Sequence, residues 1–477
     1  MILTIDIGTS TFKSAIWDYD GKLLSSSFIP LSVKSNGVKH EFEPSLWISS
    51  FESGCKELLS SKTIKNLSCI EALIISGNGP SLVPVFGLPE IKSKIYVPAE
   101  NARLWLDRRA VDYQERVSDA VSGFVDAGFF LPKILSIKND ESELYNKTKY
   151  FLGCPEYLAY ALTGEARTVF PCEGFDRWFW NDSVLNKLNL DADKFPAFIR
   201  PGGRFGTMTP DVCDLFGFAH NTPVISGGPD FFAAILGSGV TRPGEACDRS
   251  GSSEGINLCT EKRIDDKRLM SYSHPVKPYW NLSGIINTTG KAVEWGCALL
   301  GFSGFDDFIE HTKKSSPGSG GLVFIPYLAG ERAPLWDPSA RALWKGISLS
   351  SSRSDFANSI LEGIGFAIRD VIAAMEHPAM LSAGEKVKEL RVTGKLALCD
   401  TLNQIKADIT GIKVMASSSK DAELSGLAVI GACSLGKYSS YAEAISAMIK
   451  IEKQYEPNLN NKEIYNQLFD NYLQGRN

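Results

Sequence analysis

The stretch ILTIDIGTSTFKSAIW, Ile2 to Trp17, decides which fold the sequence predicts. Its first six residues are mostly apolar and β-branched, which is typical of a buried strand. After a short polar turn, side chains that point to opposite faces alternate over residues 11–17, so we expect a second strand and not a helix. A further turn at Asp18–Gly21 leads into a third expected strand over residues 22–29. The chain therefore begins with antiparallel strands joined by tight turns.

The turn between the first two strands has the composition of a phosphate-binding loop. Its residues and the lysine that follows them are Gly8, Thr9, Ser10, Thr11 and Lys13. A Walker P-loop would need a second glycine before the lysine and a helix after it, so this is a different kind of turn. Its N–H groups and hydroxyls can point at phosphate oxygens, and Asp6 can hold Mg²⁺ directly or through water. An ordinary hairpin turn with a capping aspartate explains the same residues, and this stretch alone leaves both interpretations open.

A similar pattern returns after residue 220. TPVISGGPDFFAAILGSG, Thr222 to Gly239, predicts a strand, a turn and a helix of small apolar residues. GEACDRSGSSEGINLCT, Gly244 to Thr260, predicts a strand, a glycine-serine turn and a strand. The second turn contains Gly251, Ser252 and Ser253 and resembles the first one. Two such turns facing each other can hold a nucleoside triphosphate from two sides, which predicts two similar α/β domains that close on a nucleotide.

Length and composition exclude several classes of protein. The 477 residues exceed one ordinary domain, so two or three domains are expected. A net charge of -5 without a Lys/Arg stripe argues against nucleic-acid binding, and the absence of an eighteen-residue apolar run argues against a membrane span. The start of the chain shows no secretory signal, and ten scattered cysteines without a Cys-x-x-Cys pair predict a reducing cytoplasm. The five histidines lack metal-ligand spacing, so histidine-based metal or triad chemistry is not expected.

At this point the motifs identify a family. The chain resembles the FGGY family of carbohydrate kinases, which is built on the duplicated actin/hexokinase-type ATPase fold. The motifs that carry the resemblance lie in the right order along most of the chain: DIGTSTFK at 6–13, LWLDRRA at 104–110, GGPDFFAAILGSG at 227–239, SGSSEG at 250–255, PYLAGERAPLWDPSAR at 326–341, GISLSSSRSDFANSILEG at 346–363, VTGKLALCDTLNQIKADITGIKV at 392–414 and DAELSGLAVIGA at 421–432.

The resemblance implies an α/β fold of two ribonuclease H-like domains with a central cleft. We place the N-terminal domain, with the sugar and the catalytic aspartate, at residues 1–242 and the nucleotide-binding C-terminal domain at residues 243–477. GSGVTRPGE, Gly237 to Glu245, would form the hinge, and the helices from Tyr441 onward would close the second domain. The segment Asp112 to Gly153 is expected to be largely helical.

Asp230 is the residue expected to take the proton from the sugar hydroxyl. It follows a Gly-Gly-Pro turn and begins the predicted helix, whose N-terminus favours the ionised carboxylate. An aspartate at that position can also serve only as an N-cap, and the resemblance is what favours the catalytic role.

The resemblance also implies the residues that bind ATP and Mg²⁺. Asp6 corresponds to the carboxylate that orients magnesium. The phosphates and adenosine would contact Gly8, Thr9, Ser10, Thr11, Lys13, Gly251, Ser252, Ser253, Gly290, Lys291, Gly394, Lys395 and Asn403. For Lys291, an ordinary solvated lysine is an equally good interpretation.

Two elements are expected to bind the sugar. SGNGPSLVPV, with Asn78, Gly79 and Pro80, lies where the family lines its pocket, although a plain strand-end turn explains it too. The other is a Trp-x-Asp-x-Arg element, whose aromatic face can pack on sugar C–H groups and whose carboxylate can accept hydroxyl hydrogen bonds. A surface ion pair is the alternative for its members Trp105, Asp107 and Arg109.

The chain departs from the family mainly around the sugar. Many xylulose kinases have Gln-Met-His-Gly where this chain has Asn78–Ser81, and Pro132–Ser136 lacks the family's tryptophan. Phe231 stands where an Asn or Gln often follows the catalytic aspartate, and Lys395 replaces a glycine beside the adenine. Since lysine cannot approach a base plane as closely as glycine can, nucleotide affinity is expected to differ.

These observations predict an ATP-dependent kinase of a sugar or polyol, with a ketopentose such as xylulose as the first choice. A smaller pocket beside Phe231 would favour glycerol, and the same departures leave open a non-catalytic sugar or nucleotide sensor on this fold. The presence of both Asp6 and Asp230 favours the enzyme. Homodimers are common in the family, but nothing in these residues derives one.

Overall fold

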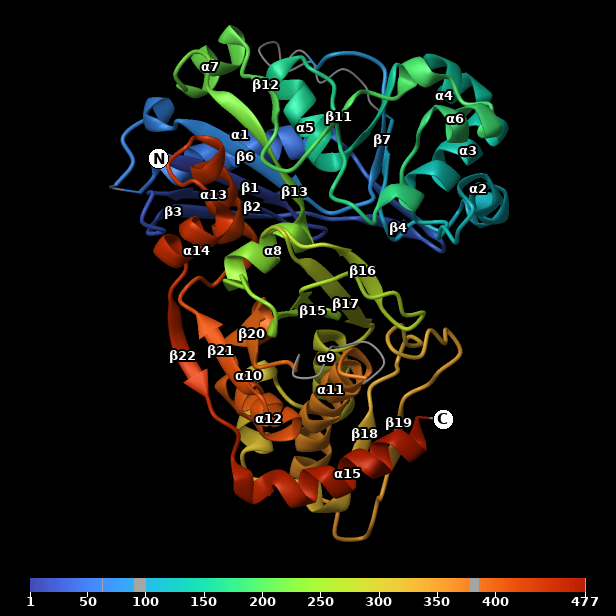
Figure 1. Cartoon of the computed structure of the whole chain (residues 1–477), viewed down its shortest axis with the longest axis vertical. Helices are drawn as coiled ribbons and strands as arrows, with labels where there is room; N and C mark the ends of the chain where they lie inside the picture. Colours follow the sequence, from blue (N-terminus) through green and yellow to red (C-terminus); the bar gives the residue numbers. More distant parts are fainter. Residues whose placement is uncertain (62, 90–99, 378–385, 477) are drawn as a thin grey trace. The chain divides into compact units, whose positions relative to one another are not determined.

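The structure is a computed structural model that describes residues 1–61, 63–89, 100–377 and 386–476. It divides into two compact units (Figure 1). Unit 1 comprises Met1–Gly237 and Glu423–Met448, and unit 2 comprises Ser238–Ala422 and Ile449–Asn477.

Unit 1 is built on a mixed sheet that follows from the opening sequence. Its strand order is β12-β13-β6-β1-β2-β3. β1 pairs antiparallel with β2 and parallel with β6, and β6 pairs parallel with β13. These strands are β1 (Ile2–Ile7), β2 (Thr11–Trp17), β3 (Leu23–Pro30), β6 (Ala72–Gly77), β12 (Arg204–Thr207) and β13 (Pro223–Pro229). The three strands predicted at the start of the chain are confirmed, and the predicted Gly-Gly-Pro turn is the last part of β13.

Helices and a smaller sheet complete unit 1. All six residues of β1 are buried because its apolar side chains face packed layers on both sides. The smaller sheet has the order β4-β5-β8-β7-β9, with β4 (Lys34–Asn36), β5 (Lys39–Phe42), β7 (Leu82–Val85), β8 (Ala102–Arg103) and β9 (Tyr150–Gly153). β10 (Thr168–Val169) pairs with β11 (Phe198–Ile199). The helices are α1 (Ser45–Leu59), α2 (Gln114–Val121), α3 (Phe130–Asp140), α4 (Ser142–Lys147), α5 (Cys154–Thr163), α6 (Asp182–Leu188), α7 (Pro210–Phe216) and α8 (Asp230–Ser238).

Unit 2 repeats the sheet topology of unit 1. Its strand order is β16-β17-β15-β14-β20-β21-β22. Like β1 in unit 1, β14 pairs antiparallel with the strand that follows it, β15, and parallel with a later strand, β20. β20 in turn pairs parallel with β21. These strands are β14 (Glu245–Ser250), β15 (Glu254–Thr260), β16 (Met270–Ser273), β17 (Trp280–Ile286), β20 (Glu389–Thr393), β21 (Lys413–Ser417) and β22 (Ile451–Tyr455). The predicted duplicated α/β fold is confirmed.

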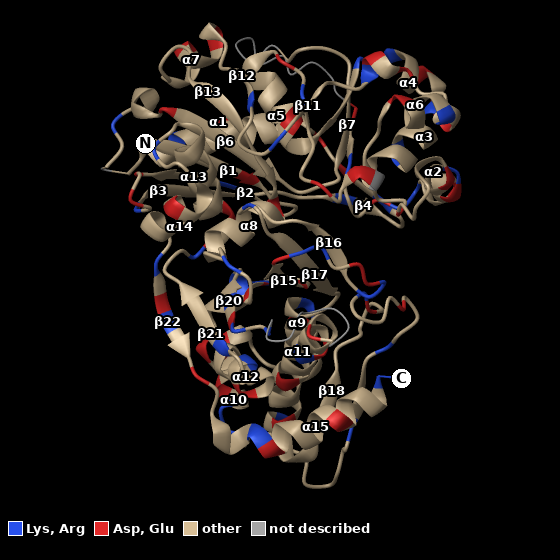
Figure 2. Ribbon diagram, viewed as in Figure 1, with Lys and Arg blue, Asp and Glu red and all other residues tan. Residues whose placement is uncertain are grey.

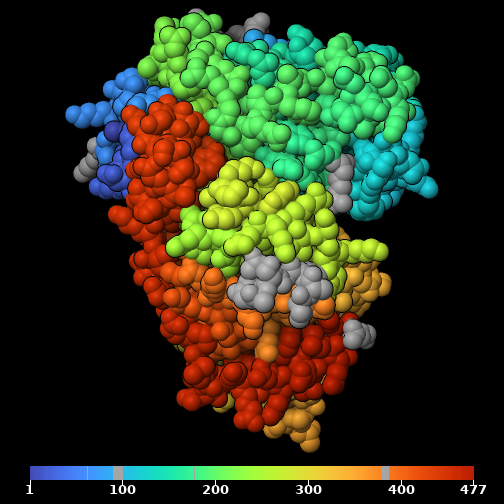
Figure 3. All heavy atoms as spheres, viewed as in Figure 1, coloured from blue at the N-terminus to red at the C-terminus, as the bar shows by residue number. Residues whose placement is uncertain are grey.

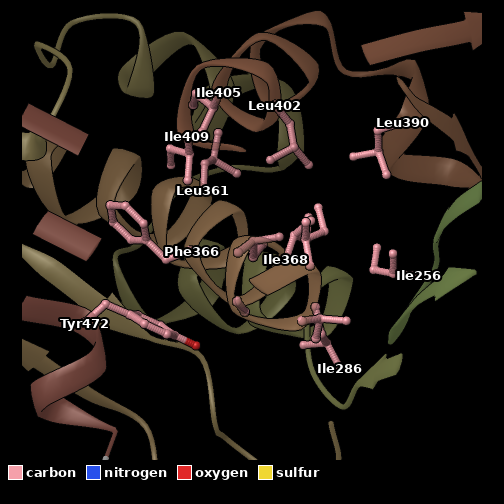
Figure 4. Close-up of a cluster of buried hydrophobic side chains, with 14 of the residues drawn as sticks. Ile256, Ile286, Leu361, Phe366, Ile368, Leu390, Leu402, Ile405, Ile409 and Tyr472 are labelled. Atoms are coloured by element: carbon pink, nitrogen blue, oxygen red, sulfur yellow. The ribbon is translucent and has the colours of Figure 1, made fainter. Parts of the chain in front are cut away.

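A long buried helix organises the core of unit 2. α11 (Arg353–Met375) begins with a capping box between Ser352 and Asp355, which satisfies backbone N–H groups that the first turn leaves unpaired. Figure 4 shows Leu361, Phe366 and Ile368 of this helix among side chains from the sheet and from other helices. The remaining elements are α9 (Gly290–Leu299), α10 (Phe305–Thr312), α12 (Asp400–Thr410), α15 (Lys462–Gly475), β18 (Val323–Ile325) and β19 (Leu343–Lys345).

One segment packs differently from the predicted division at residue 242. α13 (Ala422–Ser434) and α14 (Tyr441–Met448) lie almost entirely in unit 1, and only α15 closes unit 2 (Figures 1 and 3). The reason is the small residues of α13. A side chain at Gly426 would lie 1.8 Å from the carbonyl oxygen of Ala233, and one at Gly431 would lie 2.6 Å from Ile74. These glycines let α13 approach α8 and β6, a long-range contact that local sequence does not indicate.

Charged residues of both signs are interspersed over the ribbons of each unit (Figure 2). In the described parts of the chain, no helix combines the length and the apolar character needed to cross a membrane.

Candidate active site

The carboxyl ends of three parallel strands of unit 1 bring the main candidate residues together. Strand pairing places Asp6 opposite Ser76 and Gly77 opposite Pro229. Since β1, β6 and β13 are neighbours and parallel, their carboxyl ends share one edge of the sheet. Asp6 at the end of β1 and Asp230 directly after β13 therefore lie at the same edge, as ligand sites of such sheets do.

Lys13 lies between two buried carboxylates. It is the register partner of Asp6 on β2, and its Nζ is 3.2 Å from Asp6 Oδ2. The same Nζ is 3.8 Å from Oε2 of Glu423, a residue of α13. A phosphate oxygen bound by Lys13 would therefore share the ammonium with these carboxylates. Glu423 was missed by the sequence reasoning because 410 positions separate it from Lys13, although it lies inside the DAELSGLAVIGA motif.

Asp230 occupies a rigid junction between β13 and α8. Its half-buried side chain accepts a 2.7 Å hydrogen bond through Oδ1 from the Phe231 N–H. Directly before it, the Ser76 hydroxyl donates to the carbonyl of Gly228 at 2.8 Å. Gly228 has φ +74°, a conformation that favours glycine. The sheet therefore fixes the point at which the carboxylate of Asp230 leaves the backbone.

The turn from Gly8 to Thr11 contacts the predicted sugar element. The Gly8 N–H donates to the Thr11 carbonyl at 3.0 Å, which closes the turn, and the Ser10 side chain is exposed. The indole N–H of Trp105 donates to the Thr9 hydroxyl at 3.0 Å. The structure thus joins a predicted phosphate-binding residue to a predicted sugar-binding residue.

Asn78 holds the loop that precedes β7. Its backbone N–H and its Nδ2 both donate to the Ile7 carbonyl, at 2.8 and 2.9 Å. Its Oδ1 accepts a short hydrogen bond from Ser81, whose Oγ in turn accepts from the Trp105 N–H at 3.3 Å. Asn78 is buried and its amide is committed to this network, so it shapes the Gly79–Pro80 turn, of which Gly79 itself is exposed.

Asp107 and Arg109 bind each other and neighbouring groups of the protein. Asp107 is 0% exposed, and its Oδ2 accepts from the His40 N–H at 2.9 Å. The guanidinium of Arg109 donates to both carboxylate oxygens, at 2.7 to 3.1 Å, and also to Glu41 at 2.6 Å. Although burial raises the pKa of Asp107, these hydrogen bonds lower it below its usual value. Both oxygens are occupied by the protein, so Asp107 stabilises this loop and offers no free oxygen to a sugar.

Lys133 is a buried residue whose structural role the sequence reasoning did not assign. Its side chain is 0% exposed, and Nζ donates to the carbonyls of Pro80 at 2.9 Å and Leu104 at 2.7 Å. Burial lowers the pKa of this ammonium well below its usual value. The lysine ties the Gly79–Pro80 turn to the loop of Trp105, so it links both predicted sugar-binding elements.

Two glycines bring the predicted nucleotide elements of unit 2 together. A Cβ at Gly290 would lie 2.3 Å from the carbonyl oxygen of Gly251, and one at Gly394 would lie 2.3 Å from that of Ser250. Gly394 also has φ +87°. The start of α9 and the turn after β20 therefore both pack on the β14–β15 turn. The N–H of Gly290 donates to the Gly251 carbonyl at 3.2 Å, so this amide supports the turn.

The other predicted nucleotide residues differ in exposure. Ser252 is exposed and Ser253 is half-buried at the tip of the turn. Lys291 is exposed and forms an ion pair with Glu294 at 2.7 Å, and Lys395 is exposed after Gly394. Asn403 is buried, and its Nδ2 donates to the Ala397 carbonyl at 2.8 Å. Asn403 therefore supports the turn of residues 395–398.

A buried charged cluster lies at the base of the β14–β15 turn. Nζ of Lys406, which is 0% exposed, donates to Asp248 at 2.6 Å, to Ser250 at 2.7 Å and to Glu254 at 2.5 Å. Burial and the neighbouring Glu254 raise the pKa of Asp248 well above its usual value. Lys406 outweighs burial at Glu254 and lowers the pKa of that carboxyl. Of the two carboxyl groups, Asp248 is therefore the protonated, neutral one, and Lys406 and Glu254 form a buried ion pair beside it.

Models of one protein family match most of the chain. Residues 1–237 match the N-terminal domain of the FGGY family of carbohydrate kinases, and residues 249–435 match the C-terminal domain. A xylulose kinase of Staphylococcus epidermidis is 26% identical over 488 residues, which cover 99% of this chain and 95% of that protein.

Solved structures show the same fold. A gluconate kinase from Lactobacillus acidophilus superimposes with a TM-score of 0.84 at 21% identity, covering 100% of this chain and 97% of that one. A Plasmodium falciparum glycerol kinase with ADP superimposes with a TM-score of 0.82 at 18% identity, covering 100% and 98%. At these identities the likeness concerns the fold alone.

Proposed function

Because the chain belongs to the FGGY family of carbohydrate kinases and is therefore an ATP-dependent sugar kinase, we propose that its acceptor is a ketopentose such as xylulose. The observation that supports the reaction most strongly is the meeting of Asp6, Lys13 and Asp230 at one edge of the unit 1 sheet. The acceptor is suggested by the xylulose kinase that is similar over almost the whole chain.

The proposed roles follow from what phosphoryl transfer requires. The reaction needs in-line positioning, charge neutralisation at the transferred group and an acceptor for the hydroxyl proton. Asp230 would take the proton, and Lys13 would lie beside a phosphate oxygen. The turn at Gly251–Ser253 would contact phosphate oxygens, with Gly394 and Lys395 near the adenosine. The Gly79–Pro80 turn and the indole of Trp105 would contact the sugar.

Mg²⁺ is part of the proposal. Asp6 offers a buried carboxylate at a strand end, and carboxylate oxygens together with water are the ligands that Mg²⁺ prefers. Asp6 would hold the ion, and the ammonium of Lys13 at 3.2 Å would position that carboxylate. When bound, Mg²⁺ neutralises the charge of the phosphates.

The proposal also includes a cytoplasmic location and a homodimer, the assembly that is common in the family.

A second candidate acceptor is a small polyol such as glycerol. The ring of Phe231, next to Asp230, stacks on Phe175 with centroids 5.6 Å apart, and this bulk would reduce the room for a longer sugar.

The test is ADP release from ATP and Mg²⁺ over a panel of ketopentoses, aldoses and polyols, with Asp230→Asn alongside. Loss of the base should lower kcat by about 10²- to 10⁴-fold while calorimetry still detects ATP binding. Asp182→Asn is the matched control, because this exposed aspartate also begins a helix, α6. An unchanged kcat in Asp230→Asn would refute the assigned role. Sugar binding without turnover of any acceptor would favour the sensor.

A further inference from the structure

A continuous run of four aromatic rings lies beside Asp230 in unit 1. Phe231 stacks on Phe175 with centroids 5.6 Å apart and ring planes at 11°. Phe175 meets Trp178 edge-on at 4.9 Å, and Trp178 stacks on Phe129 at 5.6 Å. The three phenylalanines are half-buried, while Trp178 is buried. Trp178 therefore packs in the interior, and part of the phenyl surface of the run is solvent-exposed.

Both ends of this run lead to candidate site residues. Phe231 directly follows Asp230 and donates its N–H to that carboxylate. Phe129 directly follows Gly128, which packs so closely on the Trp105 backbone that a Cβ would lie 2.6 Å from the Trp105 carbonyl oxygen. The indole of Trp105 binds the Thr9 hydroxyl. The run thus connects, within one unit, the proposed base with the proposed phosphate turn.

The chemistry of this surface limits the acceptor. Phenyl faces pack well on C–H groups, but they offer no strong hydrogen-bond partner to a hydroxyl. A hydroxyl placed against them would lose its water and gain little in return, which costs binding free energy. A CH₂ or CH₃ group at the same place would gain from the contact.

We propose that the acceptor of this kinase is a deoxy form of such a ketopentose or small polyol, whose CH₂ or CH₃ group packs against Phe231 and Phe175. The apolar carbon lies close to the phosphorylated hydroxyl, because Phe231 is the chain neighbour of Asp230. The inference rests on the proposed function and narrows its acceptor class. The reaction is the ordinary one: the bond from the γ-phosphorus to the bridging oxygen of ATP breaks, the acceptor oxygen bonds to that phosphorus, ADP leaves and the hydroxyl proton passes to Asp230.

The experiment compares each ketopentose and small polyol with its monodeoxy analogues, one position at a time. ADP release gives kcat/KM, and calorimetry gives the affinity of the same pairs. One deoxy analogue should exceed its parent by about 10- to 100-fold in kcat/KM, the range in which an apolar pocket discriminates against an added hydroxyl. Calorimetry should show the same preference.

Phe231→Asn tests whether the ring causes the preference. The amide can bond a hydroxyl, so the ratio of deoxy analogue to parent should fall at least tenfold, whereas Phe231→Leu should retain the preference. Phe124→Asn is the control, because Phe124 lies near the run in sequence, is 65% exposed and should leave the ratio unchanged. Near-ultraviolet circular dichroism verifies that each variant folds. A preference that survives Phe231→Asn would overturn the inference.

The outcomes separate this inference from the proposed function. Turnover of parent sugars at least as fast as of every deoxy analogue would leave the kinase reaction standing and refute the deoxy acceptor. If no acceptor is turned over, the proposed reaction is refuted, and the calorimetric affinities still test the aromatic subsite. Tighter binding of a deoxy analogue, lost in Phe231→Asn, supports the aromatic subsite, and equal or weaker binding refutes it.

Discussion

Replacing Lys406 by methionine tests the buried charge cluster beneath the β14–β15 turn. The substitution keeps most of the side-chain volume but removes the ammonium that donates to Asp248, Ser250 and Glu254 within 2.7 Å. All four side chains are fully buried, so water cannot replace the lost partner. Glu254 already has an oxygen, Oε2, without a hydrogen-bond partner among the described residues, and it would then carry a buried, unpaired charge.

The expected loss follows from this geometry. Removing one partner of a buried ion pair costs roughly 3–5 kcal/mol of unfolding free energy. Lys406 lowers the pKa of Glu254 in the folded protein. A carboxyl with a lowered folded-state pKa stabilises the protein at pH values above its unfolded-state pKa, and this stabilisation is lost as the pH falls through the folded-state pKa. Without Lys406, only the hydrogen bonds from Asp248 and Ser250 still oppose burial, which raises this pKa, so the variant should lose stability as pH rises. The deficit of Lys406→Met should therefore be larger at pH 8 than at pH 5.

Urea unfolding at both pH values measures the loss, and native-state hydrogen exchange of β14 and β15 amides assigns it to unit 2. Asp248→Asn is the control. Since Asp248 is the neutral member, its amide analogue should cost less than about 1 kcal/mol. Lys406→Met combined with Glu254→Gln should recover much of the loss, because no unpaired charge remains. A loss below about 1 kcal/mol, or strict additivity in the double variant, would refute this charge assignment.

Two further substitutions test how the candidate site is positioned. Gly290→Ala would place a Cβ 2.3 Å from the Gly251 carbonyl oxygen, so the turn must shift and KM for ATP should rise at least tenfold. Gly255→Ala is the control, because its Cβ would meet nothing nearer than 3.6 Å and should leave KM for ATP unchanged. Equal effects of the two substitutions would contradict this argument. Lys133→Met removes the bonds to the Pro80 and Leu104 carbonyls, so KM for the acceptor should rise about tenfold while KM for ATP stays within twofold. Lys138→Met, on the same helix and part-exposed, is its control, and an equal rise of both Michaelis constants would indicate general destabilisation.

Local sequence was sufficient for elements whose side chains follow a short period. β1 was predicted from the apolar, β-branched run Ile2–Ile7 and β2 from the alternation that follows the turn, and the structure confirms both strands. The hairpin around Gly251 was predicted in the same way. The more distant partners of Asp107 and Arg109 were not predicted, because the His40 N–H and Glu41 lie more than 60 residues away from them. An aspartate followed two positions later by an arginine is equally consistent with a sugar-binding pair and with a structural ion pair.

The sequence by itself predicted the two α/β units and the family, and through the family an aspartate at the expected catalytic position, because the motifs that carry these predictions are short and local. Only the tertiary structure decided that α13 belongs with unit 1, where Glu423 joins Lys13 and Asp6. It also decided that Phe231 continues into an aromatic run and that Lys406 is buried among carboxyl groups. Those outcomes depend on which side chains meet across long stretches of chain. Close packing and the cost of burying unpaired charge select these contacts, and both depend on distance in space, whatever the separation in sequence.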